Sequence, residues 1–277
     1  MKSIMTFGKQ LYIRVFEADV FGLAAQLAYF FLLSLFPFLL FLVTLIGYLP
    51  FDEHNLMNMV ASVAPDETMR LINANLDQLA HTRNGGLLSF GLIATLWAAS
   101  NGVNAIMWAF NKAYEVEENR SFIISRLIAV VLTIGMVGII VIAIILPVLG
   151  RMIGNYIFSL FGLTEDFLTF WEMLRWVISS SVFFIVFLFL YKLAPNRKIY
   201  FKNAIWGALF ATLSWQVVSY AFSYYVENLG HYSAMYGSLG AVIVLMVWFY
   251  ISAVIILIGG IINAVIRKNK LEKNPHT

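Results

Sequence analysis

The chain has 277 residues, of which 61% are hydrophobic and 12% are charged, and its formal net charge is +3. A soluble domain carries about 25% charged residues, and a disordered chain combines low hydrophobicity with high charge, so both classes are excluded. The class that remains is an all-α, polytopic membrane protein whose outer surface faces lipid. The absence of cysteine excludes disulfides and zinc–thiolate sites.

The first 20 residues predict an amphipathic helix ahead of the first membrane span. Ile4, Phe7, Leu11 and Val15 recur at helical spacing, with charged residues between them. Acidic residues stand where a cleavable signal peptide would have its apolar region. Two positions fit this helix: the cytoplasmic membrane surface, or a site packed against the helical bundle.

Six stretches are long and apolar enough to cross a membrane, since a span needs about 20 mainly apolar residues. We expect one integral membrane domain over residues 1–277, ending in a basic tail at 267–277. The predicted spans are residues 23–49, 87–110, 127–149, 176–193, 204–226 and 239–266.

Two of the loops carry further helical patterns. Residues 51–86 predict a short outer helix that covers the bundle and ends at an Asn-Gly-Gly turn. Residues 151–175 are amphipathic and predict a segment at the outer membrane interface.

The charges predict the topology. Fourteen of the 18 Lys and Arg residues fall in the N-terminus, the second-to-third loop, the fourth-to-fifth loop and the C-terminus, whereas nine of the 15 acidic residues fall on the other side. The positive-inside rule therefore places both termini in the cytoplasm. Because the basic excess follows topology, it does not indicate nucleic-acid binding.

The first span contains polar residues and a proline. Proline removes one backbone hydrogen bond and usually kinks a helix, and Ser34 lies one turn before Pro37. Two interpretations of the kink remain. The bent helix opens a cavity or moves as a gate, or the bend is static. Gln26, Tyr29 and Ser34 are the candidate cavity residues of this span.

The second span has the most regular polar pattern. Five residues spaced by 4, 3, 4 and 3 share one helical stripe, and we expect this stripe to face into the bundle because lipid does not solvate amides. The stripe fits either the wall of a substrate pathway or hydrogen bonding between helices. Its members are Trp97, Asn101, Asn104, Trp108 and Asn111, with Ser100 beside them.

The fifth span repeats the theme with a polar stripe of Thr212, Gln216, Ser219 and Ser223, spaced by 4, 3 and 4. The candidate pathway residues are Gln216, Ser219 and Ser223 of this stripe, together with Tyr220 beside it. In the other spans, the pairs of small residues allow close helix packing, within the chain or against a second copy. Pro147, Gly259 and Gly260 are candidate kinks or flexible points.

Several kinds of site chemistry are missing from the sequence. The middle of each proposed span lacks ionisable residues, which disfavours proton coupling through a buried carboxylate. No phosphate-binding loop, nucleophile elbow or metal-ligand spacing occurs. We therefore expect no enzyme activity, cofactor or metal.

Several blocks of the sequence resemble the YihY/BrkB family of bacterial inner-membrane proteins. The blocks are residues 24–37 (AAQLAYFFLLSLFP), 97–104 (WAASNGVN), 111–114 (NKAY), 120–122 (RSF), 193–196 (LAPN) and 236–240 (YGSLG). The resemblance implies six transmembrane helices, cytoplasmic termini and a bacterial plasma membrane. Members were once labelled as a ribonuclease, a label later attributed to a different, soluble enzyme, and transport or lipid translocation has been suggested for them.

These observations support two functional hypotheses ahead of a ribonuclease. The first is a transporter or lipid-handling protein whose polar stripes line a path for a lipid-like or amphiphilic substrate. The second is a non-transporting scaffold that binds anionic lipids or protein partners. The candidate contacts with anionic membrane lipids are Arg120, Arg126, Arg197, Lys198, Arg267 and Lys268.

Overall fold

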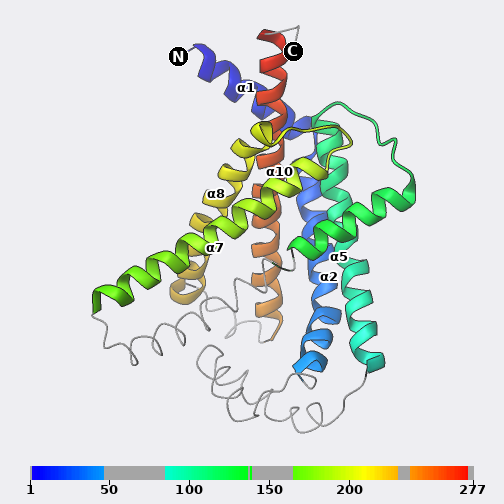
Figure 1. Cartoon of the computed structure of the whole chain (residues 1–277), viewed down its shortest axis with the longest axis vertical. Helices are drawn as coiled ribbons and strands as arrows, with labels where there is room; N and C mark the ends of the chain where they lie inside the picture. The colour runs from blue at the N-terminus through cyan, green and yellow to red at the C-terminus, as the bar shows by residue number, and fades with distance from the viewer. Residues whose placement is uncertain (1, 47–84, 137, 139–164, 230–237, 274–277) are drawn as a thin grey trace. The chain divides into compact units, whose positions relative to one another are not determined.

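The computed structural model describes residues 2–46, 85–136, 138, 165–229 and 238–273, and the regular structure in these ranges is helical (Figure 1). Five of the described helices are long and apolar enough to cross a membrane. The protein is therefore a multi-pass membrane protein, as predicted. The third predicted span is described only through its first part, where the helix Phe122–Met136 is apolar.

The long helices follow the predicted order. They are α1 (Lys2–Glu17), α2 (Val20–Ile46), α5 (Gly85–Ala113), α7 (Glu165–Leu193), α8 (Phe201–Leu229) and α10 (Ser238–Lys273). The predicted outer helix and Pro147 lie outside the described residues.

Two helices are longer than the sequence pattern predicted. The helix α7 begins at Glu165 rather than near residue 176, so residues 165–175 are its first turns. Their position at the outer membrane interface stays a prediction, and residues 151–164 lie outside the described residues. The helix α10 continues to Lys273, so the predicted tail is helical over residues 267–273. Lys, Arg, Leu and Glu are good helix formers, and no proline stops the chain before Pro275.

Contacts divide the chain into two compact units. Residues 1–32 and 99–277 belong to unit 1, and residues 33–98 belong to unit 2. The prediction of one membrane domain stays a prediction.

In unit 1, α8 packs against both α7 and α10 (Figure 1). The face of α8 is made of small residues, because Ala204, Ala208 and Ala211 are fully buried. Gly207 lies in the same stripe, and a Cβ there would overlap the carbonyl oxygen of Gly259 on α10. Small residues let the two backbones approach closely, which is how membrane helices gain packing energy.

Aromatic side chains fill the middle of unit 1. The rings of Phe110 and Tyr191 lie 5.5 Å apart between α5 and α7. The hydroxyl of Tyr191 donates a hydrogen bond of 2.9 Å to the carbonyl oxygen of Ile256 on α10. Burying Tyr in lipid-like surroundings needs such a partner, so this bond ties α7 to α10.

The first helix has two apolar faces. Phe7, Leu11 and Val15 pack on the core of unit 1, and α1 contacts α10. The other face exposes Tyr12 and Phe16. Packing on the bundle is therefore confirmed, and contact of the exposed face with a membrane surface stays a prediction.

Unit 2 joins the second part of α2 to the first part of α5. A Cβ at Gly91 would come within 2.9 Å of the backbone nitrogen of Phe41, so the two helices meet at this glycine. The helix α2 continues through Pro37, and Ser34 is buried. A gating role for this proline stays a prediction.

Candidate functional site

The polar stripe of α5 is only partly buried. Asn111 is 5% exposed, whereas Asn101 and Asn104 are half-buried. Trp97 and Trp108 are 62% and 52% exposed, so the prediction that the whole stripe faces into the bundle is wrong for these two residues. Tryptophan tolerates a lipid or interfacial environment because its ring is largely apolar. The neighbouring Ser100 is fully buried.

An arginine reaches the amide stripe near the middle of α5. Arg126, near the start of the helix Phe122–Met136, donates a hydrogen bond of 2.7 Å from Nη1 to Oδ1 of Asn101. Asn101 stands 12 residues before Ala113, which is about 18 Å along the helix. The middle of α5 carries no ionisable residue of its own, and the long side chain of Arg126 brings a charge to it from the neighbouring helix.

The stripe ends in a second cationic contact. Nζ of Lys112 lies 5.0 Å from the ring centroid of Trp108, one turn earlier on α5. We call the series Arg126, Asn101, Asn104, Trp108 and Lys112 the α5 track. A cation stands at each end of this track, with amide and aromatic groups between them.

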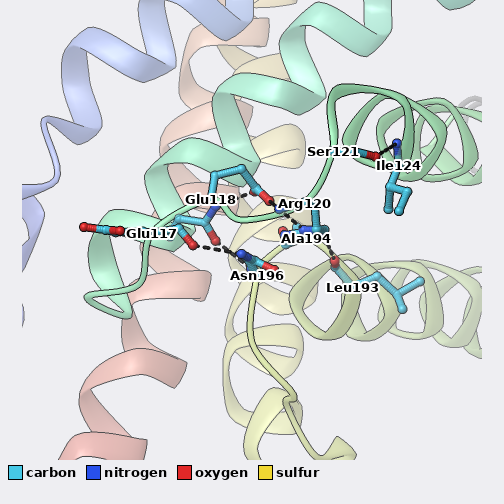
Figure 2. A network of polar contacts seen from close by, with 9 residues as sticks. Glu117, Glu118, Arg120, Ser121, Ile124, Leu193, Ala194 and Asn196 are labelled. Carbon is cyan, nitrogen blue, oxygen red and sulfur yellow. Dashed lines mark hydrogen bonds and ion pairs between the residues drawn. The ribbon is translucent and has the colours of Figure 1, made fainter.

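Asn111 has a structural role at the end of α5 that the sequence predicts to be cytoplasmic. Its amide nitrogen donates to Oε2 of Glu118 at 2.7 Å, and its Oδ1 accepts from the backbone N–H of Asn196 at 2.6 Å. Asn196 in turn donates to the carbonyl oxygen of Glu117 at 2.8 Å (Figure 2). These bonds join the segment after α5 to the loop between α7 and α8.

Arg120 completes this polar clamp. Its Nε donates to Oε1 of Glu118 at 2.8 Å, and its Nη2 donates to the carbonyl oxygen of Ala194 at 2.8 Å (Figure 2). Ala194 directly follows α7, and carbonyls at the C-terminal end of a helix lack partners within the helix. Arg120, a predicted lipid contact, is thus engaged within the chain.

The stripe of α8 makes one bond between helices. Nε2 of Gln216 donates to Oγ of Ser180 on α7 at 3.0 Å. Oγ of Ser219, one turn further, is buried and has no hydrogen-bond partner among the described residues. Tyr220 is 79% exposed, and Ser223 is also exposed.

The first-span candidates differ in exposure and belong to different units. Gln26 and Tyr29 are exposed on unit 1, and Ser34 is buried in unit 2.

Gly259 and Gly260 of α10 lie in close packing. A Cβ at Gly259 would come within 2.9 Å of the carbonyl oxygen of Gly207, and a Cβ at Gly260 would overlap the ring of Phe110. Flexibility at this pair stays a prediction.

Lys268 and Arg14 share one carboxylate. Nζ of Lys268 lies 3.4 Å from Oε1 of Glu115, and Arg14 pairs with the same oxygen. The hydrogen bond and charge of Arg14, followed by the charge of Lys268, hold the pKa of Glu115 below its ordinary value. Glu115 has a φ of 54°, a left-handed conformation that ends the α5 segment.

The remaining predicted lipid contacts differ in exposure. Arg197 and Lys198 are exposed. Nη1 of Arg267 is buried without a hydrogen-bond partner among the described residues, and so is the hydroxyl of Tyr114. Burial raises the pKa of Tyr114, and the charges of Arg267 and Arg197 oppose this rise.

Sequence patterns missed several residues of this region. Glu118, which bonds to Asn111 and Arg120, and the buried Tyr114 lie after α5, where helical periodicity gives no signal. The sequence shows Asn263 only as one polar residue in an apolar span, yet it is fully buried and bonds to α8.

In the described part of the chain, no group of three or more His, Asp or Glu side chains could hold a metal ion.

Comparison with known proteins gives a consistent result. The family model for the virulence factor BrkB matches residues 11–277. The ribonuclease-like protein YfkH of Bacillus subtilis is 48% identical over 274 residues, covering 98% of this chain and 100% of that protein. A UPF0761 membrane protein of Alteromonas mediterranea is 26% identical over 85% of this chain and 79% of its own length.

A UPF0761 membrane protein of Xanthomonas axonopodis is 26% identical over 92% of this chain and 60% of its own length. No solved structure matches the chain significantly. The family model covers almost the whole chain, and several relatives carry the name of a membrane protein, in agreement with the helices described above. The chain therefore belongs to the BrkB family of membrane proteins.

Proposed function

We propose that the protein translocates an anionic, lipid-like amphiphile across the bacterial plasma membrane, with both chain ends in the cytoplasm. In this proposal the headgroup moves along the α5 track, while the apolar tail stays in the bilayer. The observation that carries the proposal is the hydrogen bond between Arg126 and Asn101.

The position of this bond supports a pathway. A charged side chain at membrane depth is costly, and such residues usually mark substrate or ion routes. Asn101 and Asn104 are half-buried, so they are neither sealed in the core nor fully turned to lipid. Amide groups can exchange hydrogen bonds with a passing headgroup, which lowers the cost of its desolvation.

The charges of the track support an anionic substrate. The side chain of Arg126 reaches α5 near its middle, and Lys112 lies in the last turn of α5. Arginine binds phosphate or carboxylate groups through paired hydrogen bonds. The exposed ring of Trp108 between them suits the interface, where an amphiphile would enter or leave.

The orientation is part of the same proposal. Most of the basic residues gather on one side of the predicted topology, and cytoplasmic loops carry such an excess. The contact between α1 and α10 supports placing both chain ends on that side.

Translocation can be measured with the full chain in liposomes that contain fluorescent lipids. We expect an anionic probe, NBD-phosphatidylglycerol, to cross faster than in protein-free liposomes. Arg126→Gln and Asn101→Leu should slow this rate by at least about tenfold, the effect of losing one charge-assisted hydrogen bond. Lys202→Gln, an exposed charge outside the track, is the matched control and should keep the rate.

Two results would contradict this function. Equal rates with and without the wild-type protein would contradict translocation by this protein. If both track variants fold and keep the wild-type rate, the α5 track is not the path of the headgroup.

The second candidate is a scaffold that binds anionic lipids without moving them. The exposed Arg197 and Lys198 support it, since each cation near an anionic surface contributes about 1 kcal/mol. Binding to phosphatidylglycerol liposomes that Arg197→Gln weakens, without lipid translocation, would favour the scaffold. The ribonuclease-like name belongs to the B. subtilis relative, and we propose no such activity for this chain.

A further inference from the structure

Tyr114, Arg197 and Arg267 form a cluster of donors that the α5 track does not use. Tyr114 directly follows α5, Arg197 precedes α8, and Arg267 lies near the end of α10. All three belong to unit 1.

The packing of α5 on α10 brings Tyr114 toward Arg267. Gly260 of α10 faces the ring of Phe110 on α5. Tyr114 lies one turn beyond Phe110, and its N–H still bonds to the carbonyl oxygen of Phe110 at 2.8 Å. Arg267 lies seven residues beyond Gly260, which returns it to the same face of α10.

Arg197 approaches from the loop between α7 and α8. Its neighbour Asn196 is bonded to Asn111, which lies one turn before Tyr114. The charges of Arg197 and Arg267 both act on Tyr114. Arg267 also lies within electrostatic range of Arg197 and Tyr200.

The cluster holds buried donors without acceptors. The hydroxyl of Tyr114, which is 7% exposed, and Nη1 of Arg267 are both buried with no hydrogen-bond partner among the described residues. A buried polar group without a partner costs about 1–3 kcal/mol, and these two donors lie within electrostatic range of each other, which indicates a missing acceptor. Because burial raises the pKa of Tyr114, its hydroxyl keeps its proton near neutral pH and can donate.

The charge of the cluster is also uncompensated. Within the described ranges, neither Arg197 nor Arg267 forms an ion pair, and the nearby Glu115 and Glu118 are engaged by Arg14, Lys268 and Arg120. Arg197 is exposed, so the cluster reaches solvent at this residue.

We propose that Tyr114, Arg197 and Arg267 form a binding site for a phosphate group, at the end of the bundle that the sequence predicts to be cytoplasmic. Two guanidinium groups match the oxygens of phosphate, and the tyrosine hydroxyl supplies a third donor. The phosphate belongs either to a lipid headgroup or to a soluble ion. The site does not depend on the proposed translocation, because it lies outside the α5 track.

The test uses the full-length protein in detergent and two probes. Inorganic phosphate binding is measured by calorimetry, and retention of phosphatidic acid is measured by native mass spectrometry against diacylglycerol, which lacks the phosphate. We expect the wild-type protein to bind at least one phosphate probe and to retain no diacylglycerol.

Three variants and one control define the site. Arg267→Gln and Arg197→Gln should each weaken binding by at least about tenfold, and Tyr114→Phe by a smaller factor. Lys270→Gln removes an exposed charge from the same helix as Arg267 and should bind like the wild type. Arg197 is exposed and Tyr114→Phe keeps the ring, so both variants test the site even if Arg267→Gln does not fold.

The two probes separate the sources of phosphate. Binding of inorganic phosphate supports a soluble ligand, and retention of phosphatidic acid alone supports a lipid headgroup. The proposal is overturned if neither probe binds, or if Lys270→Gln weakens binding as much as Arg197→Gln does.

Discussion

Asn263 of α10 accepts a hydrogen bond of 2.7 Å from the backbone N–H of Gly207 on α8. The same amide donates to the carbonyl oxygen of Ala204 at 3.2 Å, and Asn263 is fully buried. One polar side chain therefore uses both its donor and its acceptor on the backbone of the neighbouring helix. The absence of a side chain at Gly207 is what allows this approach.

Gly207→Ala should destabilise the protein. A Cβ at this position would overlap Asn263 and the carbonyl oxygen of Gly259, so α8 and α10 would have to separate. We expect a loss of about 1–3 kcal/mol, the usual cost of overpacking, measured by thermal unfolding of the full chain in detergent. Gly8→Ala is the control, because nothing lies within 4 Å of its added Cβ; an equal loss in both variants would argue against the packing explanation.

Arg120→Lys should loosen the clamp between the segment after α5 and the end of α7. Lysine cannot reach Glu118 and Ala194 at once, since it lacks the planar fork of arginine. Losing one charge-assisted bond should cost about 1.5–3 kcal/mol and speed proteolysis between residues 114 and 121. Glu117→Gln is the control, because Glu117 enters the clamp through its backbone carbonyl; unchanged proteolysis of Arg120→Lys would refute the clamp.

The sequence predicted the helices much better than their partners. Apolar length located five spans within a few residues at most ends, because hydrophobicity is a local property of the chain. The start of α7 was missed since the charged residues between Glu165 and Arg175 lower the hydropathy without ending the helix. Helix propensity continues where apolar character stops.

The candidate site depended on contacts that have no local pattern. The spacing on α5 correctly indicated that Asn101 needs a polar partner, but Arg126 lies 25 residues away and comes from another helix. The spacing placed Asn111 in a stripe that fits either a pathway or hydrogen bonding between helices, and it gave no sign of the partner Asn196, which is 85 residues distant. Such pairs are fixed by the packing of unit 1, which periodicity in one helix does not reveal.

Gln216→Leu should weaken the contact between α7 and α8. The variant removes the bond from Gln216 to Ser180, and hydrogen bonds between membrane helices are worth about 0.6–2 kcal/mol. Thermal unfolding in detergent should show a loss of this size. Val217→Leu is the matched control, since Val217 is 68% exposed; if Gln216→Leu is as stable as this control, the bond contributes nothing to the fold.

Glu115→Gln should alter the pH dependence of stability. Arg14 and Lys268 hold the pKa of Glu115 below its ordinary value, so the carboxylate favours the folded state only while it is ionised. This contribution is fully present above the unfolded-state pKa, close to 4.5, and is lost as the pH falls through the lower folded-state pKa. The thermal stabilities of the wild type and the variant should therefore differ at pH 7 and converge as the pH falls below the folded-state pKa of Glu115. A difference that stays constant over this range would contradict the ion pairs as its source, because their contribution must vanish once Glu115 is protonated.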